Sequence, residues 1–248
     1  WDKLYKEGMA WEAAGSYSNA LTNYSNAAAI DAEFAELQFR IGTCHLALTN
    51  REAAHRAFVA ARDYDVLSVR ADSRLNQIVF DAAKPYNSEQ VLAVDAAHEL
   101  TSHSPDGILG KELFFEHVHF TFEGNYRLAR IFADRVKTLL PASLGAPRGE
   151  DWADAEFCNR RLAVTSWDEH RLWQGAKERA AVSPFTTQAS HFVNTQYFEF
   201  RRQGVIARIN PESPARDRQL YEAALAAAPE DPLLRSRFAQ YLEATGAR

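Results

Sequence analysis

The sequence has no excess of basic charge, few cysteines and no long apolar run. Its 248 residues carry 28 Lys and Arg against 33 Asp and Glu, a net charge of -5, so no electropositive field for nucleic acid is expected. No run of about 18 apolar residues is present to span a bilayer. The two cysteines, Cys44 and Cys158, have no Cys-x-x-Cys neighbour, which argues against a disulfide framework or a zinc knuckle.

The sequence does contain enough apolar surface to fold. Hydrophobic residues make up 46% of the chain and aromatic residues 12%, which suffices for the core of one large domain or two ordinary ones. The chain begins at Trp1 without an apolar signal segment and stops at Thr-Gly-Ala-Arg, directly after an expected helix end. We therefore expect a piece of a longer protein, and no cofactor is indicated.

The first 68 residues repeat with a period of 34 residues. At that offset the aligned pairs are Gly8 with Gly42, Ala20 with Ala54, Tyr24 with Phe58, Ala27 with Ala61 and Asp31 with Asp65. Such a period is typical of stacked helical hairpins. Small residues are needed where the two helices of a hairpin approach, and we expect Tyr24 and Phe58 to fill the gap to the next hairpin.

The same residues resemble the tetratricopeptide repeat family, whose consensus spacing is matched by Gly8, Trp11, Gly15-x-Tyr17, Ala20, Tyr24 and Ala27. The resemblance implies a concave face that binds a peptide or a partner protein. The positions that line this face in the family carry Asp2, Tyr5, Met9, Glu12, Glu36, Phe39 and Thr43 here. Two units make only a short groove, so packing or spacing is the alternative role.

Residues 69–141 lose the 34-residue period. Val69–Ala83 predicts a helix, and Val91–Asp95 is a short apolar run typical of a buried parallel strand. A long loop follows, and Glu123–Leu140 predicts an amphipathic helix. The order helix, strand, loop, helix predicts one partial α/β unit, whose sheet is completed by residues upstream of Trp1 or by another chain.

The loop of this unit contains the stretch FFEHVHFTFEGN, which begins at Phe114. Its core, Glu116-His-Val-His119-Phe-Thr121-Phe-Glu-Gly124, resembles the last block of the SGNH (GDSL-like) hydrolase family. That block reads Asp-x-x-His-x-Thr-x-x-Gly before the final helix, and here Glu stands in place of Asp. The resemblance implies a serine ester hydrolase or acyltransferase in which His119 is the general base and Glu116 orients it.

The nucleophile that the resemblance implies is not found in this chain. Gly15-Ser16-Tyr17-Ser18 is the only superficial candidate, and it falls at a turn between repeat helices. We therefore expect the serine, and the small ester or acyl substrate, to belong to the full-length protein, and this chain alone to be inactive. Within the stretch, the phenylalanines are expected to pack, Thr121 to order the loop, and His117 to be incidental.

Two other interpretations of the stretch stay open. His117 and His119 would share one face of an extended backbone, and His98, His103 and Glu116 are near in sequence, so a metal site is conceivable. Zinc needs three or four converging ligands, and no spacing here fixes that convergence. Alternatively, the histidines only make hydrogen bonds in a surface loop whose aromatic residues are core.

The last third of the chain is expected to be helical after a turn-rich connector at 141–149. Expected helices are Asp154–Val164, Trp167–Val182 and roughly Ser190–Ile209, with a capping box from Ser166 to Glu169. Trp152, Trp167 and Trp173 are expected to be packing anchors rather than a ligand cage. From Arg216 the repeat spacing returns at Tyr221, Ala224, Pro229, Phe238, Ala239, Leu242 and Gly246.

Together these features predict a mainly α chain in which tetratricopeptide-like hairpins flank a partial α/β unit. The expected segments are 1–68, two repeat units; 69–141, the end of an SGNH-like domain; 142–210, a helical connector; and 211–248, the start of a second repeat array. The predicted function is an interaction scaffold joined to a serine hydrolase or acyltransferase. The alternative is a non-catalytic interaction module with a degenerate α/β remnant.

Overall fold

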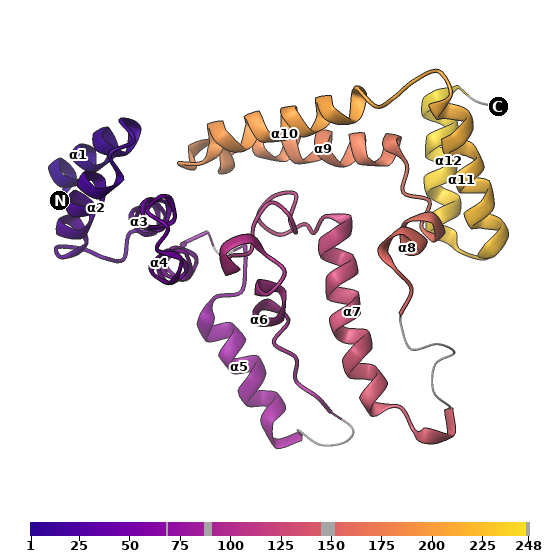
Figure 1. Cartoon of the computed structure of the whole chain (residues 1–248), viewed down its shortest axis with the longest axis horizontal. Coiled ribbons are helices and arrows are strands. Elements are labelled where there is room, and N and C mark those ends of the chain that lie inside the picture. The colour runs from indigo at the N-terminus through magenta and orange to yellow at the C-terminus, as the bar shows by residue number, and fades with distance from the viewer. Residues whose placement is uncertain (68, 87–90, 145–151, 247–248) are drawn as a thin grey trace. The chain divides into compact units, whose positions relative to one another are not determined.

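The computed structural model describes residues 1–67, 69–86, 91–144 and 152–246 (Figure 1). Over these residues the chain is mainly α-helical and has no strand, which confirms the mainly α prediction. The chain divides into two compact units, which are Trp1–His119 with Arg127–Pro141, and Phe120–Tyr126 with Ala142–Arg248. Most of the connector predicted at 141–149 lies outside the described residues.

Two helical hairpins open the first unit, as the 34-residue period predicts (Figure 1). Their helices are α1 (Asp2–Ala13), α2 (Tyr17–Ala28), α3 (Ala35–Ala47) and α4 (Arg51–Asp63). The small residues of the repeat are fully buried between the helices at Ala20, Ala27 and Ala54. The hairpins therefore pack through the positions that the repeat makes small.

The glycines of the repeat lie under aromatic rings. A Cβ atom at Gly8 would lie 2.6 Å from Cδ1 of Tyr24, and one at Gly42 would lie 2.7 Å from Cδ1 of Phe58. Glycine and ring are sixteen residues apart in both hairpins. Each ring thus packs on the glycine of its own hairpin, because the missing side chain lets the two helices approach closely. Tyr24 also belongs to a buried cluster with Leu37 and Cys44 of the next hairpin, as the sequence suggested.

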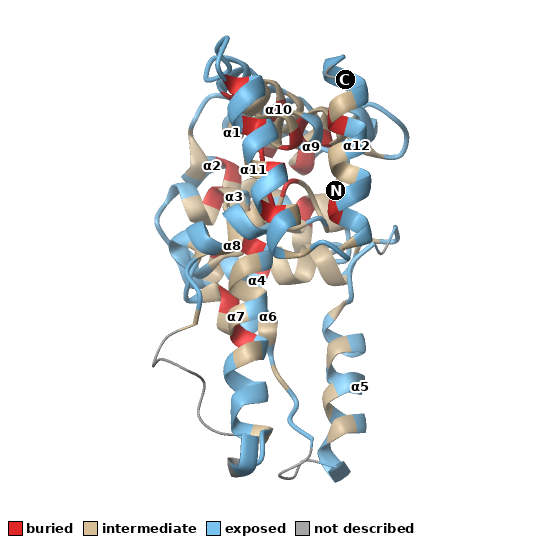
Figure 2. Cartoon of the chain, turned by 90° about the vertical axis from the view of Figure 1, so that its right-hand side faces the viewer, coloured by how far each residue is buried: buried red, intermediate tan, exposed pale blue. Residues whose placement is uncertain are grey.

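The rest of the first unit is less compact. It contains α5 (Ser73–Ala83), the 3-10 turn η1 (Lys84–Tyr86), α6 (Ala96–Thr101), the 3-10 turn η2 (Pro105–Gly107) and most of α7 (Phe122–Leu139), whose first turn is grouped with the second unit. Helix α5 carries no buried residue (Figure 2). It begins four residues later than predicted, because the Asp72 carboxylate accepts a hydrogen bond from the Leu75 N–H and caps the helix.

The strand predicted at Val91–Asp95 is not formed among the described residues. Val91 takes part in an isolated β-bridge, and the backbone is irregular from there to Asp95. The Asp95 carboxylate accepts a hydrogen bond from the His98 N–H at 2.9 Å and starts α6. An apolar run becomes a strand only beside a neighbouring strand, so the α/β character of this segment is not seen here.

The described part of the second unit contains one short helix, two longer helices and a hairpin. Its elements are the 3-10 turn η3 (Ala142–Leu144), α8 (Ala155–Arg161), α9 (Ser166–Ala180), the 3-10 turn η4 (Phe185–Thr187), α10 (His191–Ile206), α11 (Ser213–Ala227) and α12 (Pro232–Thr245). The capping box at the start of α9 is formed by Thr165 and Asp168, one residue before the predicted pair. Helix α9 packs along α10, while α11 packs on α8, α9 and α12.

The α11–α12 hairpin buries the same positions as the α2–α3 pair of the first unit. The residue numbers of corresponding positions differ by 197 throughout. The corresponding buried residues are Ala20 and Asp217, Tyr24 and Tyr221, Ala27 and Ala224, Leu37 and Leu234, and Cys44 and Tyr241. The repeat spacing noted from Arg216 onward thus coincides with a recurring packing pattern, in which one member, Asp217, is a buried carboxylate rather than a small apolar side chain.

Candidate functional site

Glu116 and His119 meet in the loop between η2 and α7. Nδ1 of His119 is hydrogen-bonded to Oε1 of Glu116. The Glu116 side chain is only 8% exposed, whereas the His119 ring is 58% exposed. Because Nδ1 is occupied by the carboxylate, Nε2 on the opposite side of the ring is directed away from it. The pair therefore has the orientation that a carboxylate and a general base adopt in hydrolytic triads.

The loop backbone holds the Glu116 carboxylate in place. Its Oε2 atom accepts a hydrogen bond from the Val118 N–H at 2.9 Å and a longer one from the His119 N–H at 3.4 Å. The Phe115 N–H donates to the His119 carbonyl at 2.8 Å and closes the loop. The longer arm of glutamate thus folds back onto its own loop, so that it reaches His119 from a position three residues away.

The charge state of Glu116 follows from these contacts. Burial alone would raise the pKa of its carboxyl group. The hydrogen bonds from the Val118 N–H and from His119, together with the positive charge that His117 and His119 can carry, outweigh burial, and the pKa lies below its usual value. At neutral pH Glu116 is therefore an anion that faces Nδ1 of His119.

The residues after the pair start α7. The hydroxyl of Thr121 accepts a hydrogen bond from the Gly124 N–H at 3.0 Å, and Gly124 is buried. Phe122 stacks on Tyr126 with a centroid distance of 6.5 Å, and Phe115 is 7% exposed. Thr121 therefore orders the entry to the helix, as the sequence suggested, and these phenylalanines contribute to packing.

The metal interpretation has less support from the geometry. His117 lies 3.4 Å from Oε2 of Glu116 through its Nδ1 atom. His98 lies in α6, and its backbone N–H is bound by Asp95. Among the residues that the structure describes, no group of three or more His, Cys, Asp or Glu side chains is placed to hold a metal ion. The histidine-rich stretch therefore brings together a pair of groups and not a ligand set.

The predicted groove residues lie on α1 and α3 and converge on a residue that the sequence did not single out. A shallow pocket there is lined by Met9, Glu12, Ala13, Tyr17, Arg40 and Thr43. Arg40 donates to Glu12 at 2.9 Å and is paired with Glu36 at 2.9 Å. Its Nε atom also donates to the Tyr5 hydroxyl at 3.0 Å. Arg40 thus links the two hairpins.

The polar groups of this groove are satisfied by one another. The Tyr5 hydroxyl donates to Glu36 at 2.6 Å, and the Tyr24 hydroxyl donates to Glu12 at 2.5 Å. Burial, followed by these hydrogen bonds to carboxylates, raises the pKa of both tyrosines. Of the other predicted residues, Phe39 packs on Phe58 with centroids 5.6 Å apart and stays 37% exposed, and Asp2 pairs with Lys6 at 2.7 Å. The groove is therefore internally paired.

The second unit contains a related network around Asp168. The Tyr221 hydroxyl donates to Asp168 at 2.8 Å, and Arg237 pairs with the same carboxylate at 2.8 Å. Arg237 also donates to the carbonyls of Leu162 and Ala163 at 2.8 and 3.1 Å. Ala163 is fully buried with a φ of 47°, so Arg237 holds a strained turn against α12. Arg40 and Arg237 each follow their tyrosine by sixteen residues.

Replacing Arg237 by alanine is expected to lower the free energy of unfolding by about 2 kcal/mol. The change leaves the Asp168 carboxylate, whose side chain is 11% exposed, without its cation, and the partial exposure of Arg237 reduces the full cost of breaking a buried pair. Arg235→Ala is the control, because Arg235 makes an exposed 3.4 Å pair with Glu230 and should change stability by less than about 0.5 kcal/mol. Urea unfolding measures both; equal losses would contradict the assigned role.

The tryptophans of this unit take part in packing. Trp173 is 1% exposed and lies against Tyr197 and Phe198. The guanidinium of Arg201 covers its ring at 4.6 Å, and Arg171 covers Trp167 at the same distance. Both rings thus already contact a cation of the chain itself, which agrees with the expectation of packing anchors.

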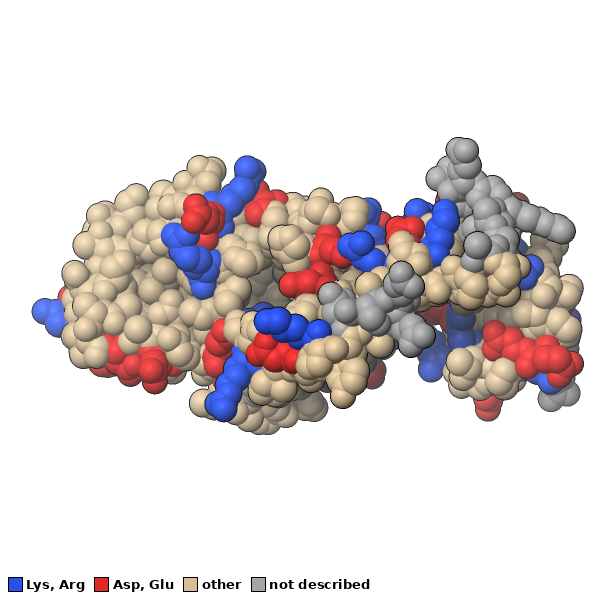
Figure 3. All heavy atoms as spheres, turned by 90° about the horizontal axis from the view of Figure 1, so that it is seen from below, with Lys and Arg blue, Asp and Glu red and all other residues tan. Residues whose placement is uncertain are grey.

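Comparison with protein families, with curated proteins and with solved structures finds no match for this chain. Within the described ranges, no helix is both long and apolar enough to cross a membrane. On the face drawn in Figure 3, acidic and basic side chains are interspersed rather than segregated.

Proposed function

We propose that this chain is a helical-repeat scaffold that carries the acid–base half of a serine ester hydrolase or acyltransferase site. One observation carries the proposal: Nδ1 of His119 is bound by the buried carboxylate of Glu116 while the ring itself is largely exposed. The serine would come from residues outside these 248, because the sequence has no Gly-Asp-Ser block. The tetratricopeptide-like hairpins would position this half site or bind a partner.

The two residues would act as follows. The Nε2 lone pair of His119 takes the hydroxyl proton of the serine as its oxygen attacks the ester carbonyl. The imidazolium then gives that proton to the departing alcohol, and an acyl-serine remains. A water molecule, or an acceptor alcohol in a transferase, repeats the step and releases the acyl group. Throughout, Glu116 keeps the Nδ1–H tautomer and stabilises the imidazolium.

The alternative of a purely non-catalytic interaction module has weaker support. A peptide-binding groove needs polar groups that are free to pair with the peptide, yet Glu12, Glu36 and Tyr5 are already satisfied through Arg40. Of the predicted groove residues, Met9, Phe39, Thr43 and the exposed Asp2, which pairs with Lys6, would remain for binding. By contrast, the nitrogen that the catalytic proposal needs, Nε2 of His119, points away from its partner.

The tautomer of His119 tests the proposal on the chain itself. With the ring neutral, the ¹⁵N chemical shifts of His119 should show the proton on Nδ1 and a bare Nε2, because the Glu116 carboxylate can only accept. His98, which is exposed in α6, is the reference and should show the Nε2–H form that free imidazole favours in water. Glu116→Gln should abolish the Nδ1–H preference at His119 and leave His98 unchanged.

Two results would overturn the proposal. A neutral His119 that carries its proton on Nε2 has no lone pair to offer a serine hydroxyl. An Nδ1–H preference that survives Glu116→Gln would mean that the loop, and not the carboxylate, sets the tautomer, so Glu116 would have no orienting role.

A further inference from the structure

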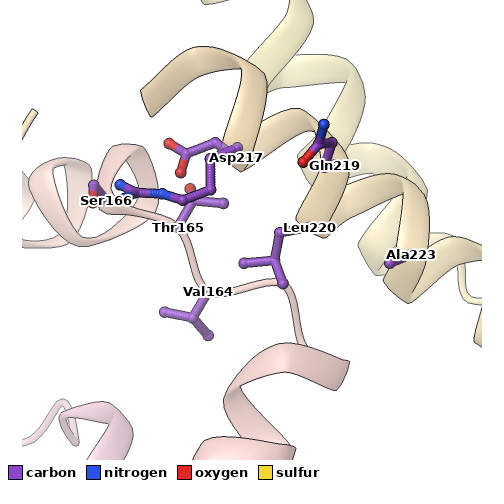
Figure 4. Close-up of a pocket in the computed structure, with 8 residues that line it drawn as sticks. Val164, Thr165, Ser166, Asp217, Gln219, Leu220 and Ala223 are labelled. Carbon is purple, nitrogen blue, oxygen red and sulfur yellow. The ribbon is translucent and has the colours of Figure 1, made fainter. Parts of the chain in front are cut away.

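A pocket of about 440 Å³ opens beside α11 in the second unit, between that helix and the turn that joins α8 to α9 (Figure 4). The residues that line it are Val164, Thr165, Ser166, Arg216, Asp217, Gln219, Leu220 and Ala223. In Figure 4 the Asp217 carboxylate lies over Thr165 on the side of Ser166, while Val164 and Leu220 form an apolar wall. The pocket thus combines one acid, Asp217, and one base, Arg216, with an apolar surface.

Asp217 is an unusual residue at its position. It is 6% exposed, and the corresponding residue of the α2–α3 pair, Ala20, is fully buried. Its described hydrogen-bond donor is the backbone N–H of Trp167, and within the part of the chain that the structure describes no basic side chain forms an ion pair with it. A buried carboxylate with so few partners costs stability, which points to a role other than packing.

The sequence explains why this face of α11 stays partly open. In the first unit α1 covers α2, and Gly8 allows the close approach to Tyr24. The residue that corresponds to Gly8 is Val205 of α10, whose side chain could not fit under Tyr221 in the same way. Val205 is instead 1% exposed in the helix that packs on α9. The short α8–α9 turn takes the place of a covering helix and leaves the pocket.

We propose that this pocket binds the side chain of a lysine or arginine presented by a partner peptide, with Asp217 as the acceptor. Val164, Leu220 and Ala223 would pack along the aliphatic stem while the charged end reaches the carboxylate. An anionic ligand is disfavoured for two reasons. The N-terminus of α9 is already capped by Thr165 and Asp168, and it also faces the Asp217 carboxylate. This site is independent of Glu116 and His119.

Titration of the chain with three small probes tests the proposal. The probes are the N-acetyl methylamides of lysine, arginine and norleucine, which share an aliphatic stem and differ in charge. NMR should show shifts of the Asp217 and Leu220 amides with lysine or arginine, and at least tenfold weaker binding of norleucine. Equal binding of norleucine would overturn the assignment, because the carboxylate would then contribute nothing.

Asp217→Asn should weaken binding of the two cationic probes at least tenfold. Glu230→Gln is the matched control, because it removes the same charge from the same hairpin at a side chain that is 90% exposed. Arg216 lines the pocket and its positive charge acts on Asp217, so Arg216→Gln should tighten binding several-fold. Unchanged binding in both the Asp217 and Arg216 variants would reject the site.

Stability separates a binding role from a structural one. Burial raises the pKa of Asp217, and the charge of Asp168 adds to this, while Arg216 opposes it; Tyr241 also faces the carboxylate. The ionised form thus destabilises the fold at neutral pH, and this cost disappears as pH falls through the raised pKa toward the ordinary value of 3.8. Asp217→Asn should therefore stabilise the free protein at pH 7 and lose that gain near pH 3. If Asp217→Asn were less stable and still bound the probes, Asp217 would only cap a helix and would have no role in binding.

Discussion

Replacing Gly8 or Gly42 by alanine is expected to lower the free energy of unfolding by about 3 kcal/mol. The added Cβ atom would lie 2.6 Å from Cδ1 of Tyr24 in one hairpin and 2.7 Å from Cδ1 of Phe58 in the other, so a ring or a helix has to move. Tyr24 is fully buried and its hydroxyl is bound by Glu12, so it has no free direction in which to shift. Urea unfolding followed by circular dichroism measures the loss.

Gly204→Ala is the matched control for these two variants. Gly204 lies inside α10, and a Cβ atom there would meet nothing within 4 Å. Because alanine favours the helix more than glycine does, this variant should gain up to about 1 kcal/mol. The same chemical change thus has opposite signs at the two kinds of site. If Gly8→Ala and Gly42→Ala were as stable as Gly204→Ala, the close helix approach would be wrong.

The hairpins could be predicted from the sequence because they depend on local spacing. Gly8 and Tyr24 recur as Gly42 and Phe58 after 34 residues, and the structure places each ring on its glycine. The contact of each ring with the glycine of its own hairpin was not predicted, since a period gives the equivalence of positions but not every neighbour that a side chain meets. The cap of α9 was shifted by one residue because Thr165–Asp168 and Ser166–Glu169 both satisfy the capping pattern.

The candidate site was predicted only where its parts are close in sequence. Glu116 and His119 are three residues apart in one loop, so their pairing could be anticipated. Arg40 and Arg237 were missed, because the residues that they bind lie up to 75 positions away. Their shared spacing from Tyr24 and Tyr221 is a signal that a comparison of the two repeat regions could have found. The strand at Val91–Asp95 failed because a short apolar run does not by itself provide a neighbouring strand.

The burial of Asp217 could not be predicted from the sequence either. In the sequence it is one acidic residue on a helix with several charged neighbours, which normally indicates a solvated face. The structure and the correspondence with the fully buried Ala20 show instead that its side chain lies on a covered face of the helix. Comparison of corresponding positions in the repeats thus identifies Asp217 as the exception.

The proposed function predicts that, in a protein that also supplies the serine, His119→Ala lowers the rate of ester hydrolysis about 10³-fold, the usual contribution of a positioned general base. His117→Ala is the matched control. His117 lies two residues away in the same loop and also faces Glu116, at 3.4 Å, but its ring does not have the Nδ1 contact to Oε1 that His119 has. Its loss should change the rate by less than about threefold, well below the loss expected for a general base. Hydrolysis of p-nitrophenyl acetate measures both.

Variants of Glu116 separate orientation of the base from folding of the loop. Glu116→Gln keeps the size of the side chain and can still accept from the Val118 N–H, but it removes the negative charge that holds the imidazolium. The maximal rate should therefore fall at least tenfold, while the unfolding midpoint at pH 7 falls only modestly, through loss of a carboxylate whose pKa is lowered in the fold. An activity that is equally reduced in the His117 and His119 variants would show that the loop matters only as structure. A rate that is unaffected by His119→Ala would exclude it as the base, whatever the state of Glu116.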